Sequence, residues 1–323
     1  MTQPILQVKN LTTRFRTERG MVTAVDQVSF DVAPGETLAI VGESGSGKSV
    51  TALSILRLIP DPPGKIESGE ILFDGEDLLK MSDAQMRSIR GDRIAMIFQE
   101  PMSSMNPALT VGMQIAEPIN LHRGTPWKRA LQKSAELLGR VQIPDAASRV
   151  DAYPHQFSGG MRQRAMIAMA LACEPKLIIA DEPTTALDVT VQAQILDLLK
   201  DLASNSNTAL ILITHDLGVV ARYADRVAVM YGGRIVETAP ARELYARPKH
   251  PYTRGLMASV PRIDGDASRP LVPIEGQPPD LAALPVGCAF MPRCKQATEQ
   301  CRTSRPPLRQ VSEFHFKACF VDD

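Results

Sequence analysis

The sequence predicts an α/β fold with a mostly parallel central sheet, an antiparallel β region and an inserted helical region. Three observations carry this prediction. Short apolar runs typical of strands alternate with helix-like segments. The runs at residues 177–181 and 209–214 are apolar almost without interruption, as in strands that are covered on both faces. Residues 22–32 alternate instead, which indicates an antiparallel strand with one exposed face.

The other elements follow in chain order. Between about residues 100 and 170 the strand pattern disappears, and we expect a helical subdomain inserted there. After Pro240 the sequence becomes Pro-rich and irregular, so we expect one domain at 1–240 and a Pro/Cys-rich extension at 241–323. Further strands are expected at residues 5–8, 37–41, 70–73, 93–98 and 227–231, and helices at 48–59, 127–138, 161–173 and 191–203.

Charge and hydropathy exclude several classes of protein. The 323 residues include 36 Lys and Arg and 36 Asp and Glu, so the formal net charge is zero. A protein that mainly binds nucleic acid would be basic, and we expect no nucleic-acid partner. The longest apolar run, residues 165–173, is far shorter than the roughly 20 residues of a spanning helix. The first ten residues resemble no secretory signal, so we expect a cytosolic chain with reduced thiols.

A glycine-rich segment follows the strand at residues 37–41. Its sequence, GESGSGKS, matches the pattern G-x-x-x-x-G-K-[ST] and precedes a helical run. Backbone N–H groups and the helix N-terminus would surround phosphate oxygens. Lys48 would contact the β- and γ-phosphates of a nucleotide, and the Ser49 hydroxyl would bind Mg²⁺. The expected nucleotide-binding residues are Gly42, Ser44, Gly45, Ser46, Gly47, Lys48 and Ser49.

Two carboxylates end the apolar strand at residues 177–181. Ligands of open α/β sheets bind at the carboxyl ends of the strands. Asp181 would therefore bind Mg²⁺, which needs only one or two carboxylates besides phosphates and water. Glu182 is placed to polarise the attacking water.

A second anion site is expected at residues 157–164, FSGGMRQR, just before a helical run. Ser158 is typical of a helix N-cap, and Gly159 and Gly160 permit close approach of the backbone. One phosphate loop and one further phosphate site suggest that two copies share bound nucleotide.

These motifs, in this order, make residues 5 to about 240 resemble an ATP-binding cassette (ABC) ATPase, whose P-loop core is RecA-like. The resemblance implies that residues 42–49, Asp181 and Glu182 bind ATP on one subunit. It implies that Ser158, Gly159 and Gly160 cap the γ-phosphate of ATP held by a facing subunit. It further implies that Gln99 senses Mg²⁺ and water near the transporter contact, and that His215 contacts the γ-phosphate. Ala186, Leu187 and Asp188 would cross the dimer interface. Phe15 would stack on adenine.

Met161 replaces the Gln that often ends this signature. This variant of the signature and the segments 99–107 and 250–262 resemble those of the importers of dipeptides, oligopeptides and nickel. That resemblance implies a peripheral ATPase at the cytoplasmic face of the bacterial inner membrane. Its implied partners are two integral membrane permease subunits, a second ABC ATPase (homologous or identical) and, indirectly, an extracytoplasmic solute-binding protein. The alternative is a soluble ABC-type ATPase that acts on nucleic acid or ribosomes; a redox module with an incidental nucleotide fold would leave Gln99 and His215 unexplained.

Four of the five cysteines, Cys288, Cys294, Cys301 and Cys319, lie in the last 36 residues. Thiolates select zinc or iron–sulfur clusters. The spacing C-x5-C-x6-C-x17-C lacks the close Cys pairs of zinc sites, whereas iron–sulfur clusters accept more variable spacing. Some members of the importer subgroup carry a [4Fe–4S] cluster in this tail, and we expect one here, with zinc or unligated thiols as alternatives. Cys173, which ends an apolar helical run, is expected to be a buried inert thiol.

Overall fold

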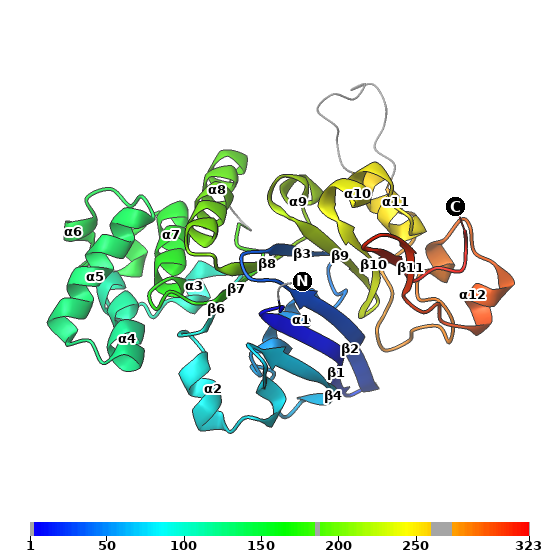
Figure 1. Ribbon diagram of the computed structural model, residues 1–323, viewed down its shortest axis with the longest axis horizontal. Helices are drawn as coiled ribbons and strands as arrows, with labels where there is room; N and C mark the ends of the chain where they lie inside the picture. The colour runs from blue at the N-terminus through cyan, green and yellow to red at the C-terminus, as the bar shows by residue number, and fades with distance from the viewer. Residues whose placement is uncertain (1–2, 185–187, 260–272, 323) are drawn as a thin grey trace. The chain divides into compact units, whose positions relative to one another are not determined.

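The computed structural model describes residues 3–184, 188–259 and 273–322, which fall into two compact units (Figure 1). The first unit comprises the residues up to Ile5, residues 32–36 and residues 80–213. The second comprises residues 6–31, 37–79 and those from Thr214 onward. The predicted α/β class is confirmed: the first unit has parallel strands, and the second has both parallel and antiparallel strands.

Parallel strands form the core of the first unit. Strand β7 (Leu177–Asp181) lies between β6 (Ile94–Ile97) and β8 (Ala209–Thr214) and pairs with both in parallel. Every residue of β7 and β8 is buried, which confirms the prediction from their uninterrupted apolar runs. Helix α7 (Gly159–Ala170) packs on β6 and on α8 (Val189–Asn205).

The predicted helical region is also part of the first unit. Its helices pack against one another through α4, α5 and α7, and they gather together in green in Figure 1. Ser134 of α5 donates a hydrogen bond of 3.0 Å to the Gly112 carbonyl of α4, so the two helices approach closely. The helices before α7 are α3 (Pro101–Ser104), α4 (Val111–Arg123), α5 (Trp127–Arg140) and α6 (Ala146–Arg149), and a 3₁₀ turn covers Pro154–Gln156.

An antiparallel sheet belongs to the second unit. Its strands have the order β2-β1-β4-β5. Strand β2 confirms the antiparallel strand predicted at residues 22–32. Strands β1 and β4 are longer than predicted; the added residues are mostly polar, so the apolar pattern did not reveal them. The strands are β1 (Leu6–Thr17), β2 (Gly20–Val32), β4 (Gly64–Phe73) and β5 (Glu76–Asp77).

A second group of strands in this unit includes two strands of the C-terminal extension. Strand β3 (Thr37–Val41) pairs in parallel with β9 (Arg226–Tyr231), which forms a hairpin with β10 (Arg234–Pro240). Strand β12 (His315–Lys317) pairs with β10 and with β11 (Arg309–Ser312). The expectation that the tail is irregular is therefore wrong for these residues; the domain boundary after Pro240 stays a prediction.

Aromatic residues join the extension to the core of the second unit. The ring of Tyr231 in β9 lies 4.5 Å from that of Tyr252 and 5.2 Å from that of Phe290, between ring centroids. Ala39 and Val41 of β3 belong to the same buried cluster. The remaining elements are α1 (Lys48–Ile55), a 3₁₀ turn at Leu78–Lys80, α2 (Asp83–Ile89), α9 (Leu217–Tyr223), α10 (Ala241–Ala246), α11 (Pro251–Ala258), a 3₁₀ turn at Met291–Arg293 and α12 (Glu299–Thr303).

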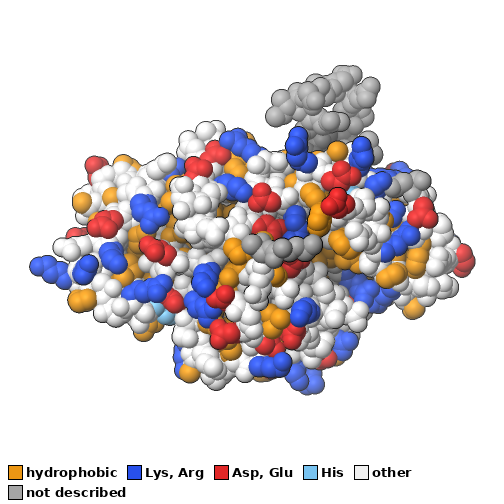
Figure 2. Space-filling model, in the orientation of Figure 1, with side chains coloured by type: hydrophobic (Ala, Val, Ile, Leu, Met, Phe, Trp, Pro, Cys, Tyr) orange, Lys and Arg blue, Asp and Glu red, His pale blue; other side chains and the backbone are white. Residues whose placement is uncertain are grey.

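The surface mixes both signs of charge. On the face drawn in Figure 2, Lys and Arg side chains are interspersed with Asp and Glu side chains. Among the helices of the described residues, none combines the length and the hydropathy that crossing a bilayer requires.

Candidate functional site

The glycine-rich segment forms a loop between β3 and α1 in the second unit. Gly47 has a φ of 101°, and a Cβ atom there would lie 2.4 Å from the Ala24 carbonyl oxygen, so only glycine fits. The Lys48 side chain is buried, and its Nζ donates to the carbonyl oxygens of Gly42 and Glu43 at 2.8 and 2.9 Å. The ammonium group therefore lies against the inside of the loop at the N-terminus of α1, where phosphate oxygens would be attracted.

Helix α1 begins at Lys48 as predicted, and Ser49 lies in its first turn. It ends at Ile55 and not at residue 59, which corrects the predicted length. The reason is that Arg57 adopts a left-handed conformation with a φ of 52°, which interrupts the helix before Pro60.

Phe15 and His215 lie in the same unit as the loop. The backbone of Phe15 in β1 pairs with Gly64 of β4, and a Cβ atom at Gly64 would lie 2.6 Å from the Phe15 ring. The half-buried ring thus packs over this glycine, and its stacking on adenine stays a prediction. His215 is exposed directly after β8, next to Asp216, which caps α9.

The first unit brings Gln99 and Glu182 together at the carboxyl ends of β6 and β7. Asp181 is the last residue of β7 and is buried. Glu182 has a left-handed φ of 46°, and its N–H donates to the Ile213 carbonyl at 2.9 Å. The Gln99 Nε2 donates to the Glu182 Oε2 at 3.1 Å. Adjacent parallel strands therefore place an amide and a carboxylate where one water could contact both.

The signature segment lies at the start of α7. The Ser158 hydroxyl accepts a bond of 3.3 Å from the Met161 N–H, which confirms the predicted N-cap. Gly159 and Gly160 form the first turn of α7, and a Cβ atom at Gly160 would lie 3.0 Å from Val191 of α8. A side chain larger than that of glycine at position 160 would therefore press against α8.

Asp188 caps α8 in the same unit. Its Oδ1 accepts a bond of 3.0 Å from the Val191 N–H, so the signature and the start of α8 lie close together. Ala186 and Leu187, predicted to cross the dimer interface, lie outside the described residues.

The predicted site residues thus divide between the units. Gln99, Asp181, Glu182, the signature glycines with Ser158, and Asp188 belong to the first unit. The phosphate loop, Phe15 and His215 belong to the second.

The four C-terminal cysteines line one small cavity in the second unit. All are free thiols; Cys301 and Cys319 are buried and the other two partly buried. Burial raises the pKa of Cys288 to about 11, and the neighbouring thiols Cys301, Cys319 and Cys294 add to this shift. The cavity has room for about 10 Å³, and no group of three or more His, Cys, Asp or Glu residues in the described ranges has an arrangement that could hold a metal ion. Cys173 is buried against the Pro118 carbonyl, as predicted.

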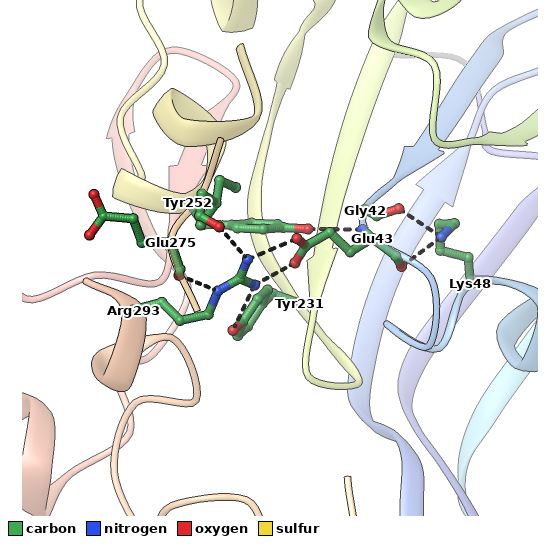
Figure 3. Close-up of polar contacts among 8 residues, drawn as sticks. Gly42, Glu43, Lys48, Tyr231, Tyr252, Glu275 and Arg293 are labelled. Atoms are coloured by element: carbon green, nitrogen blue, oxygen red, sulfur yellow. Dashed lines mark hydrogen bonds and ion pairs between the residues drawn. The ribbon is translucent and has the colours of Figure 1, made fainter. Parts of the chain in front are cut away.

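An ion pair between the extension and the phosphate loop was not predicted. Both terminal guanidinium nitrogens of Arg293 donate to the Glu43 carboxylate (Figure 3). The two residues are 250 positions apart, so no local pattern could indicate their contact.

A buried polar cluster was also missed. Glu237 of β10 is fully buried and accepts bonds from the His315 Nε2 at 2.7 Å and from the N–H groups of Lys249 and His250 at 2.6 and 2.9 Å. Burial alone would raise the pKa of Glu237, but these bonds outweigh it and lower the pKa below its ordinary value. The carboxylate therefore joins β10, β12 and the start of α11.

Two family models match the chain. One is described as ABC transporter and covers residues 25–185, which include the phosphate loop, the signature and Asp181. The other is described as Oligopeptide/dipeptide transporter, C-terminal region, and covers residues 236–301.

Relatives named as peptide transport ATP-binding proteins match nearly the whole chain. A putative peptide import ATP-binding protein of Brucella ovis is 54% identical over 98% of this chain and 97% of its own length. The oligopeptide transport ATP-binding protein OppD of Bacillus subtilis is 53% identical, covering 97% of this chain and 87% of its own. The dimeric post-hydrolysis structure of the ATP-binding cassette MJ0796, bound to ADP and Pi, matches with a TM-score of 0.66 and 29% identity, covering 73% of this chain and 99% of that chain.

Proposed function

Since this chain belongs to the ABC transporter ATP-binding proteins with an oligopeptide/dipeptide-type C-terminal region, we propose that it hydrolyses ATP to energise a bacterial importer of peptides or a related small solute. The observation that carries the proposal is the identity of more than half of the residues over nearly the full chain with a peptide import protein. The second family match supports it, because that family is described as a C-terminal region of oligopeptide and dipeptide transporters.

In this proposal the phosphate loop binds ATP. The loop N–H groups and the Lys48 ammonium, already directed into the loop, neutralise the β- and γ-phosphates. Ser49 and Asp181 would hold Mg²⁺ together with Gln99, and the ion would neutralise charge that develops on the phosphates. Phe15 would stack on adenine.

Glu182 would orient and polarise the attacking water. The hydrogen bond from Gln99 supports this role, because it holds the Glu182 carboxylate beside an amide that could contact the same water. His215 would contact the γ-phosphate after the strand that ends at Thr214.

Two cassettes would act as a pair. Ser158, Gly159 and Gly160 would cap the γ-phosphate of ATP held by the facing cassette, and Asp188 would lie at the interface. The dimeric MJ0796 relative supports such a pair. ATP would close the dimer, and hydrolysis would release it; the second cassette could be identical or homologous.

The transport pathway would be supplied by two integral membrane permease subunits, with an extracytoplasmic solute-binding protein acting on them. We place this chain at the cytoplasmic face of the inner membrane as a peripheral subunit. The helical region and the segment that follows Gln99 would contact the permeases. The names of the peptide transport relatives support this assembly.

We also propose that the four C-terminal cysteines bind a [4Fe–4S] cluster. Their convergence on one cavity supports this, as thiolates are the ligands of such clusters. The small cavity requires the thiols to move apart. The pKa values of Cys288, Cys294 and Cys319 are raised, so binding as thiolates would release protons.

Anaerobically purified full-length protein should then absorb near 400 nm and contain about four iron atoms per chain. Cys301→Ser should lose both signals, whereas Cys173→Ser, outside the cavity, should keep them. Colourless, iron-free protein would contradict the proposed iron–sulfur cluster. If that protein contained about one zinc atom per chain, the four cysteines would instead form a zinc site.

Co-purification distinguishes the importer from a soluble ABC ATPase that acts on nucleic acid or ribosomes. The tagged chain is expressed in its native bacterium, and membranes are solubilised before capture. We expect the permeases to co-purify and to stimulate ATP hydrolysis. Capture of ribosomes or nucleic acid, with ATPase activity that the permeases leave unchanged, would contradict the importer.

A further inference from the structure

One arginine of the C-terminal extension reaches the phosphate loop. Arg293 ends the 3₁₀ turn Met291–Arg293 and donates to the two carboxylate oxygens of Glu43 at 2.6 and 3.0 Å (Figure 3). The Arg293 side chain is only 5% exposed. A bidentate, desolvated pair of this kind fixes both distance and orientation.

The remaining groups of the guanidinium are also held. Its Nε donates to the Glu275 carbonyl at 3.1 Å, and one terminal nitrogen donates to the Ile274 carbonyl at 3.2 Å. The other terminal nitrogen lies 3.4 Å from the Tyr231 hydroxyl. Arg293 therefore has a fixed position in the extension and can hold a flexible partner in place.

Glu43 is the first residue after Gly42 in the loop, and its backbone is constrained as well. Its N–H donates to the Tyr252 hydroxyl at 2.9 Å, and its carbonyl accepts from the Lys48 Nζ at 2.9 Å. Side chain, N–H and carbonyl of one loop residue thus have separate partners, two of which come from residues after 240. The Glu43 carbonyl is part of the surroundings that position the Lys48 ammonium.

We propose that Arg293 is a positioning residue for the phosphate loop: through Glu43 it holds the first turn of the loop in the conformation that places Lys48 for ATP. The proposal rests on the proposed ATP-binding function of the loop. ATP affinity then depends on the contact between Arg293 and Glu43, and the extension acts on nucleotide binding without touching the nucleotide.

The test compares ATP binding and steady-state hydrolysis of full-length variants. Arg293→Ala should raise the Kd and the KM for ATP about tenfold, the loss expected for one charge-assisted contact, while kcat changes less than about twofold. Arg293→Lys keeps the charge but not the two-point contact, so its KM should lie between those of wild type and Arg293→Ala.

Arg305→Ala is the matched control. Arg305 also belongs to the extension and forms an ion pair of 2.8 Å, but with Asp26 and not with the loop. Its KM for ATP should stay within about twofold of wild type. Equal losses in Arg293→Ala and Arg305→Ala would mean that the pair only docks the extension, and would overturn the proposal.

A double-mutant cycle with Glu43→Gln completes the test. The effects of Arg293→Ala and Glu43→Gln on ATP affinity should be strongly non-additive, since each removes the same contact. Additive effects, or wild-type affinity in Arg293→Ala, would contradict the proposal; if Arg293→Ala does not fold, Arg293→Lys and Glu43→Gln give the same decision. A wild-type chain that binds no ATP would instead contradict the proposed function itself.

Discussion

Glu182 combines a left-handed backbone with a carboxylate that is bonded to Gln99 on one side. This conformation is uncommon for a residue other than Gly, Asn or Asp, and such residues are frequent at functional sites. It turns the side chain out of the alternation of β7, toward the end of β6. The geometry therefore supports the proposed water-activating role of Glu182, whereas Asp181 continues the strand and stays buried.

Glu182→Gln tests this assignment. The amide cannot accept a proton, so we expect hydrolysis to fall at least about 100-fold while ATP binding remains and a closed dimer accumulates. Phosphate release and size-exclusion chromatography with ATP measure both effects.

Glu174→Gln serves as the control, because this exposed carboxylate precedes β7 at the opposite end of the strand. It should hydrolyse ATP at the wild-type rate. Undiminished turnover in Glu182→Gln would show that another group activates the water.

Helices and strands were predictable where one face or both faces are apolar. Strands β3, β7 and β8 were predicted at their observed bounds, because continuous apolar residues end abruptly at polar ones. Strands β10 and β12 were missed because each buries a charged residue, Glu237 and Lys317. Glu237 is satisfied by His315, 78 positions away, so the pattern that permits its burial is not local.

His250, which caps α11 beside β10, makes the stability of the fold depend on pH. Burial lowers the pKa of His250 to about 4; Glu237 opposes this shift, and Lys317 and Arg254 add to it. In the unfolded chain the pKa of histidine is about 6.5, so between about pH 6.5 and 4 the unfolded state takes up a proton that the folded state does not. Stability should therefore fall over this window as pH decreases, by about 3 kcal/mol at most.

His250→Asn should remove this pH dependence. The asparagine oxygen can still accept the Tyr252 N–H that the imidazole Nδ1 accepts at 3.1 Å, so the cap of α11 is kept. Hydrogen exchange of β10 and β12 at stepped pH measures local stability. His155→Asn, at an exposed position, is the control and should keep the wild-type slope; an unchanged slope in His250→Asn would assign the acid sensitivity elsewhere.

At the scale of the whole molecule, the extension is part of the unit that carries the phosphate loop. Tyr252 and Phe290 share a buried cluster with Val41 of β3, which leads into the loop. From the sequence alone, residues 241–323 were predicted to be a separate extension. The reason is that a proline-rich sequence does not reveal contacts with residues near the N-terminus. The chemistry-bearing motifs were predictable, since each is a short local pattern, whereas Arg293 and Glu43 meet only through the fold.

Equal numbers of acidic and basic residues, interspersed over the face in Figure 2, are consistent with local contacts to a nucleotide and to protein partners. A protein that mainly binds nucleic acid would instead carry an excess of basic residues. The whole molecule thus favours a transport ATPase over its soluble alternative.

The most direct test of that claim is peptide uptake by proteoliposomes that contain this chain, its permeases and the solute-binding protein. With ATP on the side of this chain, we expect labelled peptide to accumulate and ATP hydrolysis to rise with peptide. Glu182→Gln in the same complex should abolish both. ATP hydrolysis that proceeds without uptake of peptides or related small solutes, or uptake that persists in Glu182→Gln, would contradict the account.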